Sequence, residues 1–386
     1  MSSGFAERIA ALSGAARLRT LEALSSPQGT AIEVAGERLV NFCSNDYLGL
    51  ANHPRVREAL KRAADAYGVG AGASALLSGR SVVHSELECA LAAAVGRERA
   101  LLFSSGYLAN LGMLSALVGR HDRVFHDRLN HASLIDGVRL SGAVHHRYPH
   151  ADPHALAAVM RTQPPDAISW VVTDGIFSMD GDPAPLPALA AVCRDAGARL
   201  VCDDAHGFGV VGDGRGTAAH YALSAEDVPL IVITFGKALG TAGAAVAGPG
   251  EIIEYLVQTS RTFVYDTAPP PALAVATREA LALALERPAL RDMLFANIAY
   301  FRAGLRARGL PESSSETPIQ PVVLGSDRRA LAAAQALRYR GLYVRAVRPP
   351  TVPEGTARLR ICLSAAHTQE QIDCLLDALI ALPEAT

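Results

Sequence analysis

RLVCDDAHGFGVVGDGRGTAAHYALSAEDVPLIVITFGKALG, residues 199–240, contains two short apolar runs, each followed by a loop of chemically reactive side chains. The first run, at 200–202, leads into DDAH, and the second, at 230–234, leads into FGKALG. Short apolar runs of this kind are typical of buried strands in a parallel sheet, and the carboxyl ends of such strands form the ligand crevice of α/β proteins. The stretch therefore predicts an α/β fold with a site at one edge of its sheet.

The same alternation extends outward, from about residue 40 to residue 250. Four further runs are predicted strands, ALLFSS, RVFHD, ISWVVTDG and AAVAG, with helical patterns such as HSELECALAAAVG between them. We expect a mostly parallel central sheet with helices on both faces. After the prolines at 269–271 the pattern predicts a smaller α+β C-terminal domain. The expected domains are residues 1–40, an N-terminal segment packing with the small domain, then 41–270 and 271–386.

Composition narrows the possible functions. Of the 386 residues 50% are hydrophobic and 19% charged, and 36 basic side chains stand against 38 acidic ones. This balance excludes binding of nucleic acid or of anionic membranes by bulk charge. The six cysteines show no CxxC spacing and the N-terminal segment has no export signal, so we expect reduced thiols and a cytoplasmic protein. Arg278 and Glu279 interrupt the most apolar stretch well before the length of a membrane span.

Lysine is almost absent. Of the 36 basic residues 34 are arginine, and the two lysines are Lys61 and Lys237. Lys61 lies among charged residues of an amphipathic helical pattern, as a solvated lysine would. Lys237 follows an apolar run in a glycine-flanked loop, where burial would lower the pKa of its amine and favour Schiff-base chemistry that arginine cannot perform. A phosphate-binding G-x-x-x-x-G-K-[ST] loop does not fit, because Ile231 and Ala238 stand at two of its required positions.

Asp203, Asp204 and His206 follow the first apolar run, where carboxylates need a polar partner. Pyridoxal phosphate supplies one, because its ring nitrogen requires a carboxylate and its phenolic oxygen requires a donor. The glycines at 207, 209 and 212 form a G-x-G-x-x-G, which suggests a nicotinamide enzyme as an alternative. Those glycines neither follow the strand directly nor open a helix, so we favour pyridoxal phosphate.

Two more loops carry candidate residues. His131, in DRLNHASL, follows a predicted strand into the same crevice, although an isolated histidine is more often structural than functional. Gly106 and Tyr107 open a helical pattern whose amides would hold a phosphate while Tyr107 covers an aromatic ring, with an ordinary helix cap as the alternative. The histidines at 145, 146, 150 and 154 lack partners at metal spacing, so we interpret them as a solvated connection and expect no metal site.

With these residues in place, the chain resembles the α-oxoamine synthase family of pyridoxal-phosphate enzymes, in the class-II aminotransferase superfamily. The resemblance runs in order through SNDYLGL, SGRSVVHSELE, DRLNHASL, FSMDGD, DDAHGFGVVGDGRG, TFGKALG and RLRICLSAAHT. It implies transferase fold type I, pyridoxal 5'-phosphate as cofactor, and a homodimer with shared active sites. The stretch RPPTVPEGTARLR, at 348–360, resembles the members of the family that act in biotin synthesis. Those enzymes join L-alanine to a pimeloyl thioester of CoA or acyl carrier protein and release carbon dioxide and the carrier thiol. The alternative is a sister enzyme of the same family, either one that acylates glycine with acetyl-CoA or succinyl-CoA or another member, such as those that acylate serine with palmitoyl-CoA.

The resemblance also implies roles for single residues. Lys237 would hold the cofactor covalently and later act as the base at the substrate α-carbon. Asp203 would pair with the pyridine nitrogen, His206 with the phenolic oxygen, and His131 would stack over the ring. The implied sets are catalytic Lys237, His131, Asp203 and His206; cofactor-binding Gly106, Tyr107, His131, Ser178, Asp203, His206, Thr234, Lys237 and, from the partner subunit, Thr267; and substrate-binding Arg19, Asn45, His131, Thr351 and Arg360.

Some positions depart from the family pattern or have two candidates. Ala73 and Arg80 stand where relatives often have glycine and a smaller or aromatic residue, in a stretch that helps to shape the amino-acid pocket. Arg17 is an alternative to Arg19 for contact with the acyl substrate. These residues bear on which amino acid and which acyl group the enzyme takes.

Overall fold

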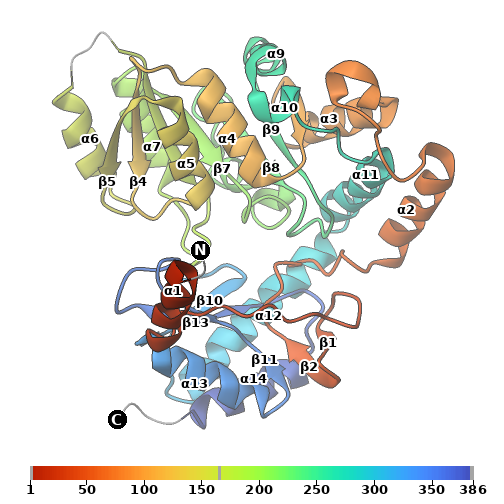
Figure 1. The fold of residues 1–386 in the computed structure, drawn as a ribbon, viewed down its shortest axis with the longest axis vertical. Helices are drawn as coiled ribbons and strands as arrows, with labels where there is room; N and C mark the ends of the chain where they lie inside the picture. Colours follow the sequence, from red (N-terminus) through yellow and green to blue (C-terminus); the bar gives the residue numbers. More distant parts are fainter. Residues whose placement is uncertain (1–2, 164–166, 383–386) are drawn as a thin grey trace. The chain divides into compact units, whose positions relative to one another are not determined.

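The computed structural model describes residues 3–163 and 167–382. Contacts divide the chain into two units (Figure 1). The large unit consists of residues 53–178 and 183–291, and the small unit of the described residues up to 52, 179–182 and those from 292 onward. The domain boundaries expected from the sequence, at 40/41 and 270/271, stay a proposal. Within the described ranges no helix combines the length and the apolar character needed to cross a bilayer.

A seven-stranded sheet in the order β3-β9-β8-β7-β6-β4-β5 forms the centre of the large unit (Figure 1). Its strands from β4 to β8 are parallel, whereas β9 runs antiparallel to both β8 and β3. The six strands predicted from apolar runs are all present, and the mostly parallel α/β fold is confirmed. The strands are β3 (Arg99–Phe103), β4 (Arg123–Asp127), β5 (Val144–Tyr148), β6 (Ser169–Asp174), β7 (Arg199–Asp203), β8 (Leu230–Thr234) and β9 (Ala244–Gly248).

The histidine-rich segment is not only a solvated connection, as the sequence suggested. His145 and His146 belong to β5, which pairs with β4 at the edge of the sheet. Val144 is exposed and Tyr148 is buried, so the strand lacks the continuous apolar run by which the others were recognised. An edge strand of an α/β sheet can remain largely solvated on its outer side, and its composition is correspondingly polar.

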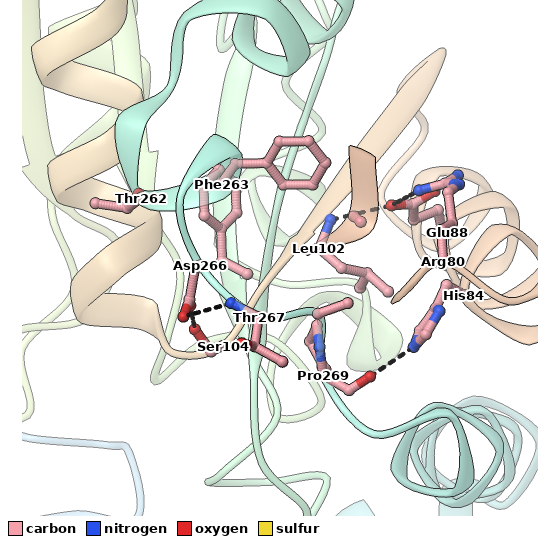
Figure 2. Close-up of a pocket in the computed structure, with 13 residues that line it drawn as sticks. Arg80, His84, Glu88, Leu102, Ser104, Thr262, Phe263, Asp266, Thr267 and Pro269 are labelled. Atoms are coloured by element: carbon pink, nitrogen blue, oxygen red, sulfur yellow. Dashed lines mark hydrogen bonds and ion pairs between the residues drawn. The ribbon is translucent and has the colours of Figure 1, made fainter. Parts of the chain in front are cut away.

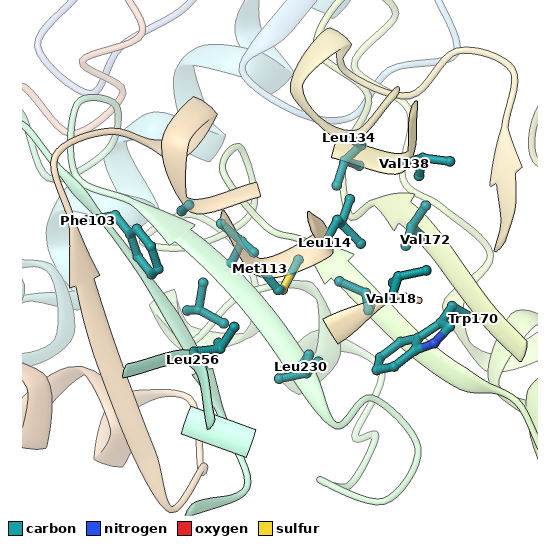
Figure 3. Packing of buried hydrophobic residues seen from close by; sticks show 14 of the residues in the cluster. Phe103, Met113, Leu114, Val118, Leu134, Val138, Trp170, Val172, Leu230 and Leu256 are labelled. Carbon is teal, nitrogen blue, oxygen red and sulfur yellow. The ribbon is translucent and has the colours of Figure 1, made fainter. Parts of the chain in front are cut away.

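Helices cover both faces of this sheet. On one face, Val172 and Leu230 pack with Met113 of α4, Leu134 of α5 and Leu256 of α9 (Figure 3). Along each strand, the residues that alternate with this set point to the other face of the sheet, and they are buried as well. The helices of the large unit are α2 (Pro54–Tyr67), η1 (Ala75–Gly79), α3 (Val82–Ala94), α4 (Gly106–Leu117), α5 (Ala132–Ser141), α6 (Pro153–Arg161), α7 (Leu186–Asp195), η2 (Gly212–Gly214), α8 (Thr217–His220), α9 (Gly250–Thr259), α10 (Arg261–Val264) and α11 (Pro271–Glu286).

The small unit contains two three-stranded sheets, β1-β2-β11 and β10-β13-β12. Strand β2 from the N-terminal part pairs in parallel with β11 from the C-terminal part, so both ends of the sequence build this unit. Its elements are α1 (Ser3–Gly14), β1 (Ala31–Val34), β2 (Glu37–Asn41), most of α12 (Pro288–Ala307), β10 (Ile319–Gly325), α13 (Asp327–Arg338), β11 (Leu342–Tyr343), β12 (Ala346–Val347), β13 (Ala357–Cys362) and α14 (Gln369–Ile380).

Candidate active site

Lys237 lies in the connection between β8 and the antiparallel strand β9. Backbone hydrogen bonds close this hairpin: the N–H of Phe235 donates to the carbonyl of Gly243 over 2.9 Å, and that of Thr241 donates to the carbonyl of Phe235 over 2.8 Å. The carbonyl of Lys237 itself accepts from the N–H of Gly240 at 2.8 Å. The half-buried lysine is therefore held on a rigid turn at the carboxyl end of β8.

Asp203 ends β7, the strand next to β8, and is buried. Its Oδ1 accepts from the N–H of Ala205 at 3.1 Å, and its Oδ2 accepts from Nδ2 of Asn110 at 2.6 Å. Asn110 comes from α4, and its Oδ1 is buried without a hydrogen-bond partner among the described residues. Hydrogen bonds to both oxygens stabilise a buried carboxylate. Asp203 is thus built to carry a negative charge inside the protein.

A second buried carboxyl group, that of Asp174, stands beside Asp203 at the end of the neighbouring strand β6. Burial, followed by the charge of Asp203, raises the pKa of Asp174 well above its usual range, and the N–H of His131, which donates to its Oδ2 at 2.7 Å, only partly opposes this. Two adjacent carboxyl groups divide their roles when their surroundings separate their pKa values. The pKa of Asp174 therefore lies well above the usual carboxyl range, while both oxygens of Asp203 accept hydrogen bonds.

His131 caps the N-terminus of α5. Its Nδ1 lies 2.7 Å from the hydroxyl of Ser133 and accepts from the N–H of Ser133 at 3.3 Å. The ring of Tyr107 meets the imidazole edge to face, with ring centroids 6.3 Å apart. Burial lowers the pKa of His131, the charge of Asp203 raises it, and that of Lys237 lowers it further. The imidazole is therefore neutral near physiological pH and lies in the same electrostatic environment as Asp203 and Lys237.

The N-terminus of α4 lies against the end of β8. Ser105 caps this helix by accepting from the N–H of Leu108 at 3.2 Å. A Cβ on Gly106 would come within 2.5 Å of Cγ2 of Thr234, so only glycine fits there. The first amides of a helix have no partner within the helix and attract anions. This position is consistent with the predicted phosphate site at Gly106 and Tyr107, because Gly106 lies against Thr234, at the end of the strand that leads into the lysine hairpin.

The second aspartate of the DDAH motif has a different role from the first. Both oxygens of Asp204 accept from Thr217, one from its N–H at 2.7 Å and one from its hydroxyl at 2.5 Å. Burial raises the pKa of Asp204 to about 7. Asp204 therefore braces the glycine-rich loop that leads to α8, while Asp203 remains the carboxylate of the site.

The remaining cofactor candidates lie at the same edge of the large unit. His206 is buried in the loop that follows β7, and Ser178 follows β6. Together with Lys237 and Asp203 they supply an amine, a carboxylate, an imidazole, a hydroxyl and a helix N-terminus. This set of donors and acceptors fits pyridoxal phosphate, which needs a covalent amine, a carboxylate at its ring nitrogen, a donor at its phenolic oxygen and an anion site for its phosphate. The individual assignments made from the resemblance stay proposals.

Thr267 lies beside a pocket of the large unit (Figure 2). Its N–H donates to Oδ1 of Asp266 at 2.9 Å, and the same carboxylate accepts from the hydroxyl of Ser104. Figure 2 shows that His84 reaches the same segment, with its Nε2 2.8 Å from the carbonyl of Pro269. The backbone of the segment is thus fixed while the side chain of Thr267 stays exposed.

Arg80, one of the two departures from the family pattern, lines this pocket. Its guanidinium forms an ion pair with the buried carboxylate of Glu88, whose Oε1 also accepts from the N–H of Leu102 at 3.2 Å. The other departure, Ala73, accepts from the N–H of Ala268 through its carbonyl at 3.0 Å. Ala73 therefore supports the segment that carries Thr267, whereas Arg80 is anchored to Glu88 of α3.

Apart from His131, the substrate candidates lie in the small unit. Arg360 of β13 donates from Nη1 to Oδ1 of Asn45 at 3.0 Å and to Sγ of Cys362 at 2.9 Å. The hydroxyl of Tyr47 donates to the same Oδ1 of Asn45 at 3.2 Å. Burial raises the pKa of Cys362, partly opposed by the charge of Arg360, so the sulfur remains a neutral thiol. The guanidinium predicted to bind a carboxylate is therefore held in one orientation by neutral acceptors.

The other substrate candidates are Arg19 and Thr351, which are joined by a hydrogen bond of 3.2 Å from Nη2 to Oγ1. Arg17 instead forms ion pairs with Asp327 and Glu354. Since Arg17 already pairs with two carboxylates, Arg19 is the better candidate for contact with the acyl substrate. That assignment stays a proposal.

Sequence reasoning missed Asn110 and Asp174 and gave Ser133 no role. Asn110 lies inside a helix and carries no sequence signal of its own. Asp174 had one, because it ends a predicted apolar strand next to the strand of Asp203. Asp174 could therefore have been predicted as a site residue by the same reasoning that identified Asp203.

Comparison with known proteins decides the family. The model of aminotransferase class I and II matches residues 37–379. The chain belongs to this family. The resemblance seen in the motifs is confirmed, because curated relatives named 8-amino-7-oxononanoate synthase are 57% identical over 363 residues in Methylococcus capsulatus (94% of each chain) and 52% identical over 380 residues in Pseudomonas putida strain F1 (98% of this chain and 97% of the relative).

Solved structures agree with this fold. A serine palmitoyltransferase from S. paucimobilis with a bound PLP–myriocin aldimine has a TM-score of 0.92 and 30% identity, covering 98% of this chain and 96% of that one. An 8-amino-7-oxononanoate synthase from Francisella tularensis has a TM-score of 0.77 and 31% identity, covering 89% and 97%. The fold type and the pyridoxal phosphate cofactor predicted from the sequence are confirmed.

Proposed function

We propose that this chain is an 8-amino-7-oxononanoate synthase, which joins L-alanine to a pimeloyl thioester in biotin synthesis. The observation that carries the proposal is that the hairpin lysine Lys237 and the buried carboxylate Asp203 follow adjacent strands, in a chain that is 57% identical to a relative of that name. In the reaction a bond forms between the α-carbon of alanine and the thioester carbonyl, and the carrier thiol leaves. The carboxylate of alanine leaves as carbon dioxide, and a proton takes its place.

Pyridoxal phosphate, when bound, supplies an electron sink for the negative charge that develops at the α-carbon. Lys237 would hold it covalently, and the free amine of Lys237 would accept the α-proton at Nζ. Asp203 would hold the ring nitrogen of the cofactor through its buried carboxylate. The N-terminus of α4 binds the phosphate, and His206, Ser178 and Thr234 contact the cofactor's other polar atoms.

Residues of the small unit position the amino acid. Arg360, which is held by Asn45 and Cys362, would bind the carboxylate of alanine. Arg19 and Thr351 contact the pimeloyl group, for which coenzyme A and acyl carrier protein are both possible carriers. A cytoplasmic location also stays a proposal.

Thiol release tests the substrate assignment. Purified, cofactor-loaded protein is given pimeloyl-CoA with L-alanine in one reaction and acetyl-CoA with glycine in another. We expect release of free thiol and carbon dioxide in the first reaction, and at least about a hundredfold less in the second, because a site built for one substrate pair loses several contacts with the other. The inverse result would contradict the proposal and assign the chain to the glycine-using enzymes.

We also propose a homodimer in which Thr267 of one subunit reaches the cofactor phosphate of the other. Several exposed apolar side chains lie close in sequence to the residues that line the pocket beside Thr267. These exposed residues are Leu76, Leu77, Val82 and Tyr265. Such a group of exposed apolar residues is typical of an interaction surface. A second copy of the chain would bury it.

Leu77→Glu is expected to weaken this dimer by at least about tenfold, because a charge would be buried against apolar side chains. Leu77 is 82% exposed in the single chain, and Leu140, which is 63% exposed on α5, provides a matched control. Light scattering across a range of concentrations should show that Leu77→Glu dissociates while Leu140→Glu does not. Equal behaviour of the two variants would place the dimer interface elsewhere.

A further inference from the structure

A continuous line of hydrogen bonds connects Asp203 to His131. It passes through the side chains of Asn110 and Ser133, to which no role has been assigned so far. Nδ2 of Asn110 lies 2.6 Å from Oδ2 of Asp203 and 2.8 Å from Oγ of Ser133. Oγ of Ser133 in turn lies 2.7 Å from Nδ1 of His131. Asn110 and Ser133 are both fully buried, so water does not compete for these bonds.

The direction of each bond in this line follows from chemistry. A carboxylate only accepts, so the Asn110 atom next to Asp203 is the amide nitrogen, and its second hydrogen is directed at the hydroxyl oxygen of Ser133. That oxygen accepts from Asn110, which leaves the hydrogen of the hydroxyl for Nδ1 of His131. The N–H of Ser133 also approaches Nδ1, at 3.3 Å, as a helix cap. Two donors therefore converge on Nδ1.

A ring nitrogen that accepts cannot carry a hydrogen. We propose that Asn110 and Ser133 are positioning residues that hold His131 as the neutral tautomer with its hydrogen on Nε2, so that His131 meets its ligand as a hydrogen-bond donor and not as a base. A neutral ring also avoids a second positive charge next to the protonated ring of the cofactor. The part of this inference that concerns the ligand rests on the proposed function, whereas the tautomer itself does not.

The consequence for the reaction is a division of labour. His131 offers an N–H to a developing negative charge on an oxygen of the substrate, and Lys237 remains the group that accepts the α-proton. Because Asn110 also donates to Asp203, one buried amide orients the carboxylate of Asp203 and, through Ser133, the imidazole of His131. Loss of Asn110 should therefore affect the carboxylate and the imidazole together.

Nitrogen-15 spectra of histidine-labelled protein test the tautomer directly. Long-range proton–nitrogen correlations distinguish a ring protonated at Nε2 from one protonated at Nδ1, and the His131→Gln variant identifies the signal among those of the 12 histidines. We expect the Nε2–H pattern at pH 8 in the cofactor-loaded protein and again after the cofactor is removed. An Nδ1–H or doubly protonated His131 in the unmodified protein would overturn the proposal.

Variants then test the two positioning residues. Ser133→Ala removes one donor to Nδ1 and should shift the ratio of tautomers toward Nδ1–H by about fivefold, as expected for a hydrogen bond of ordinary strength. Ser141→Ala, on the same helix, removes a hydroxyl that donates to the carbonyl of Val138 and accepts from the N–H of Ala143, and it should leave the spectrum of His131 unchanged. Ser133→Thr keeps the hydroxyl and should restore the Nε2–H pattern.

Asn110→Ala should shift the tautomer ratio in the same direction and raise the dissociation constant of pyridoxal phosphate about tenfold, because Asp203 loses a charge-assisted bond. Ser115→Ala, on the same helix, should do neither, since its hydroxyl bonds to the carbonyl of Leu111. An unchanged ratio in both Ser133→Ala and Asn110→Ala would remove the positioning role. These spectra do not depend on turnover, so a protein that fails the alanine assay still gives a clear result.

Discussion

Lys237→Ala is expected to reduce thiol release by roughly ten-thousandfold or more. The variant loses both the covalent attachment of the cofactor and the base at the α-carbon, and proton transfer by a positioned side chain alone contributes about a hundredfold to ten-thousandfold. No nearby side chain replaces it, because the other lysine, Lys61, lies on α2 and is exposed. The measurement is thiol release with pimeloyl-CoA and L-alanine at saturating cofactor.

The scarcity of lysine provides an unusually clean control for this experiment. Lys61→Ala removes the remaining lysine side chain, which contacts Glu58 at 3.9 Å on the protein surface, and should leave activity unchanged. Borohydride should fix the cofactor covalently to Lys61→Ala protein but not to Lys237→Ala protein. Near-normal turnover of Lys237→Ala, or covalent capture at Lys61, would reject Lys237 as the nucleophile.

Asp203→Asn has the second largest expected effect, a fall in turnover of roughly a thousandfold, which corresponds to about 4 kcal/mol of lost barrier reduction. The amide keeps the size of the side chain but carries no charge, so the ring nitrogen of the cofactor is no longer held protonated. The two oxygens of Asp203 each accept a hydrogen bond, one from the N–H of Ala205 and one from Nδ2 of Asn110. In the asparagine variant the amide nitrogen would replace one of these oxygens and would face a donor. Single-turnover kinetics with L-alanine should locate the loss in the step that removes the α-proton.

Asp204→Asn is the matched control, because the two aspartates are adjacent in the chain and both are buried. Asp204 contacts Thr217 and not Asn110, and burial already raises its pKa to about 7, so a neutral side chain is tolerated there. Activity within a few fold of the unmodified protein is expected. If Asp204→Asn lost activity as severely as Asp203→Asn, the assignment of the two carboxylates would have to be revised.

Much of the sheet could be predicted because parallel strands are buried on both faces and show as apolar runs. Strand β5 was missed, since His145 and Arg147 lie at an open edge and give no apolar signal. The reversed direction of β9 did leave a signal. The connection 235–243 is shorter than the dozen or more residues that a parallel crossover requires.

The site was predictable where chemistry is carried by one residue at the end of one strand, as for Lys237 and Asp203. It was not predictable where a role depends on a contact across the fold. Asn110 is an ordinary polar residue in a helical pattern, and only the packing of α4 against the sheet brings it within 2.6 Å of Asp203. Ser133 gains its role in the same way, because it lies between that asparagine and His131.

The hairpin that carries Lys237 also restricts how this protein can change over evolution. The pairing of β8 with β9 places Thr234 opposite Ala244, and side chains along β9 alternate between the two faces of the sheet. Gaining or losing one residue in this connection would slip the register and exchange the inward and outward sets of β9. Loops at the other strand ends can vary in length without moving the nucleophile, whereas this one can vary only in sequence. The position of Lys237 therefore depends on the length of the connection between β8 and β9 as much as on the contacts of the lysine.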